Sequence, residues 1–340
     1  MSMNPVNSTP LQPAPLDHIP VKSISRRKKV VLLSLLCFFV LCSSLILGFH
    51  GFIAWTLARP TIAPLSSNPA KAVGLPYQNV TFPSSNGSST LSGWYIPTAQ
   101  ASSQTVIFSH GYGGNREELW VPIYSLAKKL HESGYNVLMF DYGYVHPEND
   151  RIVTAGIQES KELLGAVNYI KEKGSERVYV WGFSMGAGTA LQTALQTKDI
   201  DGMILDSTFL LNPDTLYHNM KQYVNIPKFP SLPLVRVFFP LLNGVNMNQI
   251  PYQAVTTHEY PMPIYFIHGD EDERAPHEIA EGVYKNQHNV FSNYWMLPTG
   301  KHELIYSAKP DEYITRTFGF LKTISRPQLP ESGFVEMSIE

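Results

Sequence analysis

The 340-residue sequence predicts an α/β domain with a doubly wound, mostly parallel sheet, preceded by one apolar helix. Short apolar runs alternate with longer helix-forming segments from residue 104 onward, as they do where crossover helices join parallel strands. A Gly-Phe-Ser-Met-Gly turn at residues 182–186 joins one such run to a segment of small residues, and residues 30–57 contain no charged side chain. These three observations fix the fold class.

The apolar stretch at residues 30–57 is a candidate transmembrane helix. About twenty apolar residues in a helix cross the hydrocarbon of a bilayer. Four basic residues at 26–29 precede the stretch, whereas only Arg59 follows it closely. The positive-inside rule then predicts a single-pass cell-membrane protein with a cytoplasmic N-terminus and an extracytoplasmic domain. A signal peptide cleaved after Ala58 is the alternative.

Composition divides the rest of the chain. We expect a disordered cytoplasmic tail at residues 1–29, a Pro/Ala/Ser-rich linker at 58–75, the domain at 76–323 and a C-terminal tail at 324–340. Because the predicted core excludes the apolar span, a chain that begins near residue 60 is expected to be soluble and active.

Charge and cysteine usage exclude several classes of function. Beyond Arg59 the chain carries 20 basic and 27 acidic side chains, a net charge of −7. That balance argues against a nucleic acid or an anionic membrane surface as ligand. Both cysteines, Cys37 and Cys42, fall in the apolar span, so the domain has no disulfide, thiol nucleophile or cysteine metal site. We expect no cofactor and no metal.

The elements of the domain follow in order. Two early runs, at residues 80–82 and 91–95, predict a starting hairpin with its turn through 84–89. Further strands are expected at 105–109, 136–140, 178–181, 203–205, 264–267 and 294–297, with helices at 117–131 and 156–173.

The turn at residues 182–186 places a serine between a strand and a helix. A sharp turn of this kind pushes the serine hydroxyl out above the sheet, and a Cβ at either flanking glycine would collide with the crowded backbone. The pattern predicts Ser184 as a catalytic nucleophile. A purely structural turn serine is the alternative.

A nucleophilic serine needs a general base. Residues 294–297 form the last predicted core strand, and His302 lies in the loop directly after it. We therefore predict that His302 takes the serine proton and returns it to the leaving group. Of the other histidines, His258 and His277 could also line a pocket.

An acid that orients the base should lie in the loop after residues 264–267, which holds four carboxylates at 270–273. Chemistry alone does not choose among them. Asp270 or Asp272 could instead cap a helix that begins near Pro276. Asp206, at the end of another predicted strand, is a second candidate for the acid.

Two backbone N–H groups should stabilise the negative charge that develops on a substrate oxygen. The N–H of Met185, at the start of the helix after the nucleophile, is one candidate donor. The Gly-rich turn at residues 110–115 follows an early strand and could supply the other. A phosphate loop is the alternative for this turn, but a Lys-Ser/Thr pair and G-x-G-x-x-G spacing are both missing.

Together these segments resemble the α/β-hydrolase superfamily over roughly residues 76–323. The His110-to-Asn115, Gly182-to-Gly186 and Leu205-to-Phe209 stretches most resemble single-domain serine hydrolases related to the prolyl-oligopeptidase catalytic domain and the membrane-anchored Bem46/ABHD-type proteins. Residues 268–276 match the H-G-x-x-D-x-x-V-P loop of these enzymes, with Ala275 in place of valine. The resemblance implies that Asp272 is the triad acid.

The resemblance also implies that the backbone N–H of Tyr112 is the second oxyanion donor, and that the Tyr112 side chain forms part of the acyl-pocket wall. The sequence departs from the family pattern after Asp141. The family usually has a D-x-R-G-x-G-x-S run there, but the arginine is missing, so we expect that turn to be built differently.

The insertion at residues 207–259 falls where this fold commonly carries a lid. Its aromatic residues could be ordinary packing or the wall of an apolar pocket: Phe209, Tyr217, Tyr223, Phe229, Phe238, Phe239 and Tyr252.

The sequence thus predicts a membrane-anchored serine hydrolase that cleaves an ester, thioester or amide through an acyl-enzyme on Ser184. Carboxylesterase, thioesterase and peptidase-like activities all fit this prediction. The alternatives are an acyltransferase that uses the same triad and a non-catalytic binding protein that retains the fold. The expected partners are a small-molecule or acylated substrate and the membrane, contacted through residues 30–57.

Overall fold

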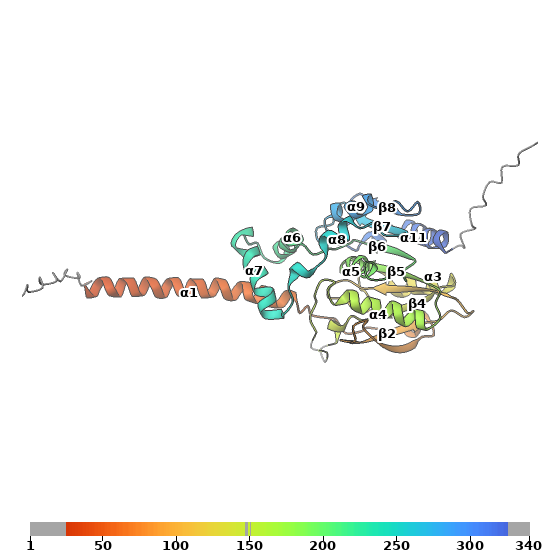
Figure 1. Ribbon diagram of the computed structural model, residues 1–340, viewed down its shortest axis with the longest axis horizontal. Coiled ribbons are helices and arrows are strands. Elements are labelled where there is room, and N and C mark those ends of the chain that lie inside the picture. Colours follow the sequence, from red (N-terminus) through yellow and green to blue (C-terminus); the bar gives the residue numbers. More distant parts are fainter. Residues whose placement is uncertain (1–24, 147–148, 150, 326–340) are drawn as a thin grey trace, which may run out of the picture. The chain divides into compact units, whose positions relative to one another are not determined.

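The computed structural model describes residues 25–146, 149 and 151–325 (Figure 1). The predicted tails at 1–29 and 324–340 lie almost entirely outside these described residues. The chain divides into two compact units between Gly48 and Phe49.

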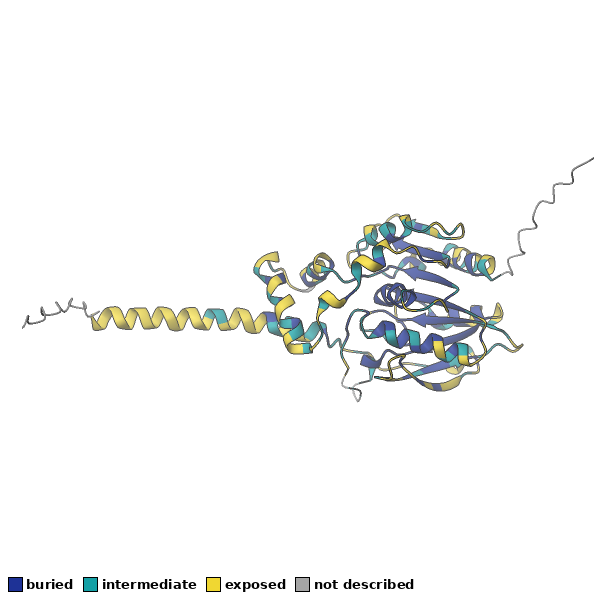
Figure 2. Cartoon of the chain, in the orientation of Figure 1, coloured by how far each residue is buried: buried dark blue, intermediate teal, exposed yellow. Residues whose placement is uncertain are grey.

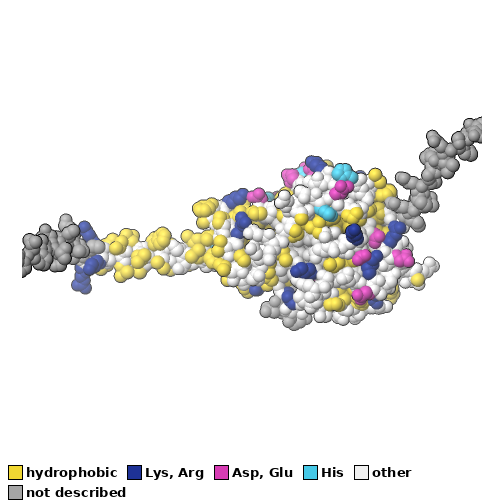
Figure 3. All heavy atoms as spheres, in the orientation of Figure 1, with side chains coloured by type: hydrophobic (Ala, Val, Ile, Leu, Met, Phe, Trp, Pro, Cys, Tyr) yellow, Lys and Arg dark blue, Asp and Glu magenta, His cyan; other side chains and the backbone are white. Residues whose placement is uncertain are grey.

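The first unit contains most of a long helix, α1 (Arg26–Leu57). Its side chains up to residue 48 are almost all exposed (Figure 2), and beyond the basic residues 26–29 they are largely hydrophobic (Figure 3). The mean hydropathy of its most apolar window is 2.9, and none of that window is buried in protein. By length and composition this helix could cross a membrane.

The second unit is built on one eight-stranded sheet in the order β1-β2-β4-β3-β5-β6-β7-β8. β2 is antiparallel to both of its neighbours, and the six strands from β4 to β8 run parallel to one another. The predicted hairpin is therefore confirmed. The strands are β1 (Gln78–Pro83), β2 (Thr90–Ile96), β3 (Gln104–Ser109), β4 (Asn136–Phe140), β5 (Arg177–Phe183), β6 (Gly202–Asp206), β7 (Ile264–Gly269) and β8 (Asn293–Leu297).

Helices cover both faces of this sheet, which confirms the doubly wound α/β prediction. Successive residues of a strand point to opposite faces, so Val180 of β5 joins one apolar core and Trp181 joins the other. The first core lies under α4 (Glu159–Glu172), α5 (Met185–Ala194), α8 (Tyr252–Thr257) and α9 (His277–Lys285). The second lies under α2 (Pro69–Val73), α3 (Ile123–Glu132), α10 (Ile305–Ala308) and α11 (Pro310–Ile324).

Two predicted helices begin later than expected. The helix predicted from residue 117 starts at Ile123, because Glu118 has a positive φ of 32° and Pro122 is the N-cap. The helix predicted from residue 156 starts at Glu159, because Gly156 has a φ of 104°, which no α-helix accommodates.

The insertion at residues 207–259 folds into α6 (Pro213–Tyr223), α7 (Lys228–Asn243), the short 3-10 helix η3 (Met247–Gln249) and α8. A capping box between Asn212 and Thr215 begins α6. α6 and α7 share a third apolar cluster with the C-terminal end of α1, in which Ala54 and Ala58 are fully buried. The expectation that the core excludes the apolar span is therefore wrong at its last residues. Small side chains there let the helices approach closely.

The predicted linker at residues 58–75 is held against the domain rather than running free. The Glu117 carboxylate accepts hydrogen bonds from the backbone N–H groups of Ser66 and Ser67, at 2.5 and 2.7 Å, and from the Tyr124 hydroxyl at 2.6 Å. The segment also contains α2.

Candidate active site

Ser184 occupies the junction of β5 and α5 in a strained conformation, with φ 50° and ψ −115°. A Cβ on Gly186 would lie 2.0 Å from the Ser109 carbonyl oxygen, and one on Gly182 would lie 2.6 Å from the Ala187 Cα. Only glycine fits at these two positions, as the turn pattern predicts.

Three side chains from separate loops meet at this turn. The Ser184 hydroxyl lies 2.8 Å from Nε2 of His302, and Nδ1 of the same ring lies 2.7 Å from the Asp272 carboxylate. Ser184 follows β5, Asp272 follows β7 and His302 follows β8. The arrangement can pass the serine proton to the imidazole while the carboxylate holds the ring by its Nδ1–H.

Asp272 is fixed from two sides. Its Oδ1 accepts hydrogen bonds from the backbone N–H groups of Arg274 and Ala275, at 2.9 and 2.8 Å, just before α9. Burial opposes its ionisation, but hydrogen bonds from His268 and His302 outweigh that effect and hold the pKa of Asp272 well below its usual range. The Asp272 carboxylate therefore accepts backbone hydrogen bonds from the following turn, as a helix cap would, and also contacts the imidazole of His302.

The competing candidates lie elsewhere. The buried Asp206 carboxylate accepts hydrogen bonds from the hydroxyls of Tyr313 (2.7 Å) and Ser207 (2.9 Å). Asp270 is largely exposed and lies 4.0 Å from His277. His258 packs edge-on against Tyr260.

The two predicted oxyanion donors lie beside the serine. Met185 follows it directly and begins α5. The turn that carries Tyr112 also approaches closely, since a Cβ on Gly111 would lie 3.5 Å from the Ser184 Cβ. The Tyr112 hydroxyl donates to the Leu57 carbonyl oxygen at 3.0 Å, so this turn also contacts the end of α1.

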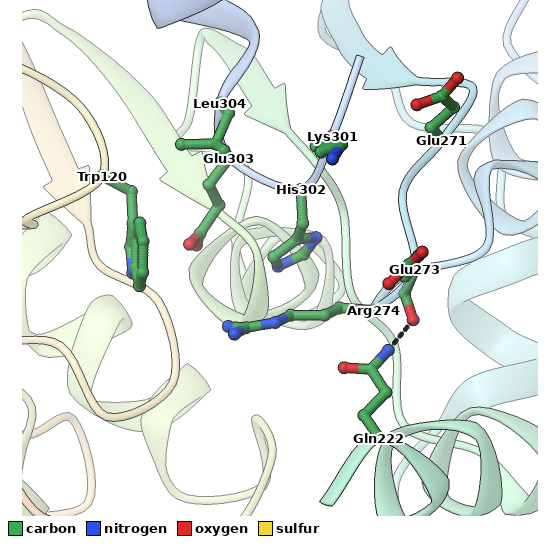
Figure 4. A pocket seen from close by; sticks show the side chains of 9 residues that line it. All are labelled: Trp120, Gln222, Glu271, Glu273, Arg274, Lys301, His302, Glu303 and Leu304. Carbon is green, nitrogen blue, oxygen red and sulfur yellow. Dashed lines mark hydrogen bonds between the residues drawn. The ribbon is translucent and has the colours of Figure 1, made fainter. Parts of the chain in front are cut away.

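Two cavities meet at His302, and that residue, Glu303 and Arg274 line both. The larger, of about 540 Å³, has mostly apolar walls and reaches Ser184, Met185 and Tyr112. The smaller, of about 230 Å³, is lined mainly by polar and charged residues (Figure 4). In that view Arg274 extends past His302 toward Trp120, over whose ring its guanidinium lies at 5.8 Å.

The aromatic residues of the insertion differ in their surroundings. Phe209 and Phe239 line the larger cavity, as does the side chain of Tyr112. Tyr217 instead donates a hydrogen bond to the Ile226 carbonyl oxygen, and Phe229 is exposed. Among the residues that the model describes, no cluster of His, Cys, Asp and Glu has the arrangement of a metal site.

Comparison with known proteins bears on the fold. Residues 104–232 match the model of the family described as "alpha/beta hydrolase fold". The esterase Pf2001 of Pyrococcus furiosus has the same fold, with a TM-score of 0.62 and 24% identity over 79% of this chain and 98% of that one. The chain has the α/β-hydrolase fold.

Curated proteins similar to this chain include a bacterial and a vertebrate protein. The uncharacterized protein YqkD of Bacillus subtilis is 25% identical over 228 residues, which are 65% of this chain and 72% of YqkD. The lysophosphatidylserine lipase ABHD12 of Danio rerio is 25% identical over 202 residues, which are 56% of this chain and 49% of the lipase. The match with the lipase therefore spans about half of that protein.

The turn after β4 departs from the α/β-hydrolase pattern, as expected, and Asp141 pairs with an arginine from another segment of the chain. The guanidinium of Arg116 donates to Asp141 at 2.6 Å, and the Arg116 backbone N–H donates to the same carboxylate at 2.7 Å. Both side chains are buried. Hydrogen bonds from His146 and Arg116 outweigh the effect of burial and lower the pKa of Asp141 to about 2. The arginine thus lies directly after the Gly-rich turn, a pairing that the sequence does not reveal.

Sequence reasoning also missed two buried carboxyl groups near Ser184. An oxygen of Glu118 accepts a hydrogen bond from the Gly111 backbone N–H at 2.6 Å. Glu303 follows His302 with a positive φ of 57°, and its backbone N–H donates to Ser207. Burial raises the pKa of Glu118 to about 7 and the pKa of Glu303 well above its ordinary value.

These raised pKa values predict a stability that falls with rising pH. The folded state holds protons on Glu118 and Glu303 that the unfolded chain releases above a pKa of about 4.5, so the favourable contribution is complete below that pH. It is lost as the pH rises through about 7 for Glu118, and as the pH rises through the raised pKa of Glu303. We expect the Tm to decrease from pH 5 to pH 8, and the variant Glu303→Gln to show a smaller decrease.

Thermal unfolding followed by circular dichroism at four pH values between these limits tests this expectation. The exposed Glu271 offers the control substitution Glu271→Gln, in which Tm should fall with rising pH as steeply as in the wild type. Part of the slope should persist in both variants, because burial and the neighbouring Glu159 also raise the pKa of Glu162 to about 7. If Tm falls with pH as steeply in Glu303→Gln as in the wild type, the Glu303 carboxyl does not hold a proton in the folded state.

Proposed function

We propose that this α/β-hydrolase is a serine hydrolase that cleaves a carboxylic ester through an acyl-enzyme on Ser184. The observation that carries the proposal is the continuous hydrogen-bonded series from the Ser184 hydroxyl through His302 to Asp272, at 2.8 and 2.7 Å. The named esterase and lipase among the similar proteins support an ester over an amide.

The mechanism follows from this geometry. As the Ser184 oxygen attacks the ester carbonyl carbon, Nε2 of His302 takes the serine proton, and Asp272 remains ionised and stabilises the imidazolium. The N–H groups of Met185 and Tyr112 stabilise the oxyanion. The imidazolium then protonates the leaving alkoxide as the ester C–O bond breaks. A water molecule, deprotonated by His302, attacks the acyl-enzyme and releases the carboxylic acid and Ser184.

We also infer that α1 anchors the enzyme in the cell membrane with its N-terminus in the cytoplasm and the hydrolase domain outside. The apolar length of α1 and the four basic residues at its start support both parts of this proposal. The signal-peptide alternative would instead release the domain from the membrane.

One labelling experiment tests the activity and the location together. We expect a fluorophosphonate probe to modify Ser184 in the carbonate-washed membrane fraction of cells that produce the full chain, and mass spectrometry of the labelled peptide to locate the adduct. Heat-denatured membranes should not react. A membrane-impermeant probe should label the same serine in intact spheroplasts.

Each part of the proposal has its own contradicting result. Failure to label, or a label on another serine, would refute the nucleophile. A labelled soluble protein that begins after Ala58 would refute the anchor. Reaction with a permeant probe but not with the impermeant one would reverse the orientation.

A further inference from the structure

We propose that the last turns of α1, residues 49–57, are a wall of the acyl-binding site, and that the 540 Å³ cavity which they help to enclose holds one long acyl chain of the ester substrate. The inference rests on the proposed function, because the reaction at Ser184 decides which group of the substrate occupies the cavity. It gives the end of the apolar helix a part in substrate selection.

One face of the helix end contributes to the cavity. The side chains of Phe49, Phe52, Ile53 and Thr56 recur at intervals of three, one and three residues, which places them on the same side of a helix. They line the same cavity as Ser184. From the insertion, α6 and α7 supply further apolar side chains of the wall, including Leu216, Met220 and Phe239.

Hydrogen bonds hold this helix end in place. The Asn243 side chain of α7 donates to the Ala54 carbonyl oxygen at 3.0 Å and accepts from Arg59 at 2.6 Å. The Tyr112 hydroxyl donates to the Leu57 carbonyl oxygen at 3.0 Å. Because Tyr112 also carries the predicted oxyanion donor, the cavity wall and the reacting centre are joined through one residue.

The residues that line the cavity favour an alkyl chain over a peptide as its ligand. The charged side chains that line the cavity, Arg274 and Glu303, are residues that it shares with the polar cavity at His302. A peptide in the apolar part would bury amide groups without hydrogen-bond partners, which is costly. An alkyl chain has no polar group to satisfy, and each methylene that it buries improves binding by about fourfold. The volume lies within the range of small-ligand sites, roughly 300–1,000 Å³.

The test compares two substitutions on the same helix end. Phe52 lines the cavity and is 63% exposed, whereas Trp55 is 46% exposed and is not among the lining residues. Both are aromatic, and neither is buried, so Phe52→Ala and Trp55→Ala should both fold. We would measure kcat/KM of full-length protein in lipid nanodiscs for p-nitrophenyl acetate and p-nitrophenyl decanoate.

Phe52→Ala should lower the decanoate-to-acetate ratio by about tenfold, from the apolar contact that it removes. Trp55→Ala should keep the wild-type ratio within about twofold. The variant Ile53→Trp, which fills part of the cavity, should also lower the decanoate-to-acetate ratio.

Failure of this inference is distinguishable from failure of the proposed function. If wild-type protein turns over acetate but the ratio is unchanged in Phe52→Ala and Ile53→Trp, the helix end is not a wall of the acyl site. If both alanine variants lower the ratio equally, the effect comes from the helix surface and the inference is again wrong. Absence of any Ser184-dependent turnover would refute the proposed function itself, and this inference with it.

Discussion

Ser184→Ala is expected to reduce kcat for a short-chain p-nitrophenyl ester by about 10⁶, the size of effect that follows loss of the nucleophile in a triad. The substitution removes the hydroxyl that lies 2.8 Å from His302 and leaves the carboxylate–imidazole pair without a nucleophile to activate. Alanine meets the same backbone strain as serine at a φ of 50°, so the Tm should change little.

A double variant sharpens this test. If Ser184 and His302 act as one unit, Ser184→Ala combined with His302→Ala should be no slower than Ser184→Ala alone. Steady-state kinetics on both proteins, with circular dichroism to check the fold, would measure this. Independent, multiplying losses would mean that the two residues act in separate steps, and normal turnover by Ser184→Ala would overturn the nucleophile assignment.

Asp272→Asn is expected to reduce kcat by about 10⁴, because an asparagine can hold the imidazole in the tautomer that cannot accept the serine proton. The carboxylate lies 2.7 Å from Nδ1 of His302, and its replacement by an amide keeps the shape of the side chain. The measurement is kcat for the same ester at a pH where the wild type is fully active.

Asp270→Asn is the matched control, since Asp270 lies two residues away in the same loop and is largely exposed. It should keep kcat within about tenfold of the wild type. A large loss in Asp270→Asn, or in Asp206→Asn but not in Asp272→Asn, would assign the orienting acid to that other residue.

The parts of the site that sequence predicts are those fixed by local geometry. The glycines at 182 and 186 are required because a side chain at either would overlap neighbouring backbone, so the pattern identifies the turn by itself. The place of His302 follows from chain order, since a loop after the last core strand meets the same sheet edge. The strands could be found for a similar reason, because each is a short apolar run.

The parts that sequence misses depend on contacts between distant segments. Arg116 and Asp141 are 25 residues apart and form a buried ion pair, yet each looks like an ordinary surface charge in the sequence. Nothing in the order of residues shows that Glu118 and Glu303 are buried together near Gly111. The predicted start of α3 is also wrong. Glu118 has a positive φ, which its helix propensity does not predict.

The contacts of residues 54–58 bear on how the chain can be processed. A signal peptidase that cut after Ala58 would separate the domain from Ala54 and Leu57, whose carbonyl oxygens accept from Asn243 and Tyr112. It would also uncover the side chains of Leu216 and Phe239, which are buried in the third apolar cluster. Exposed apolar surface of this kind promotes association with other molecules. The compact unit that contains Ser184 begins at Phe49, within α1, so a cut after Ala58 would fall inside that unit and not at its edge.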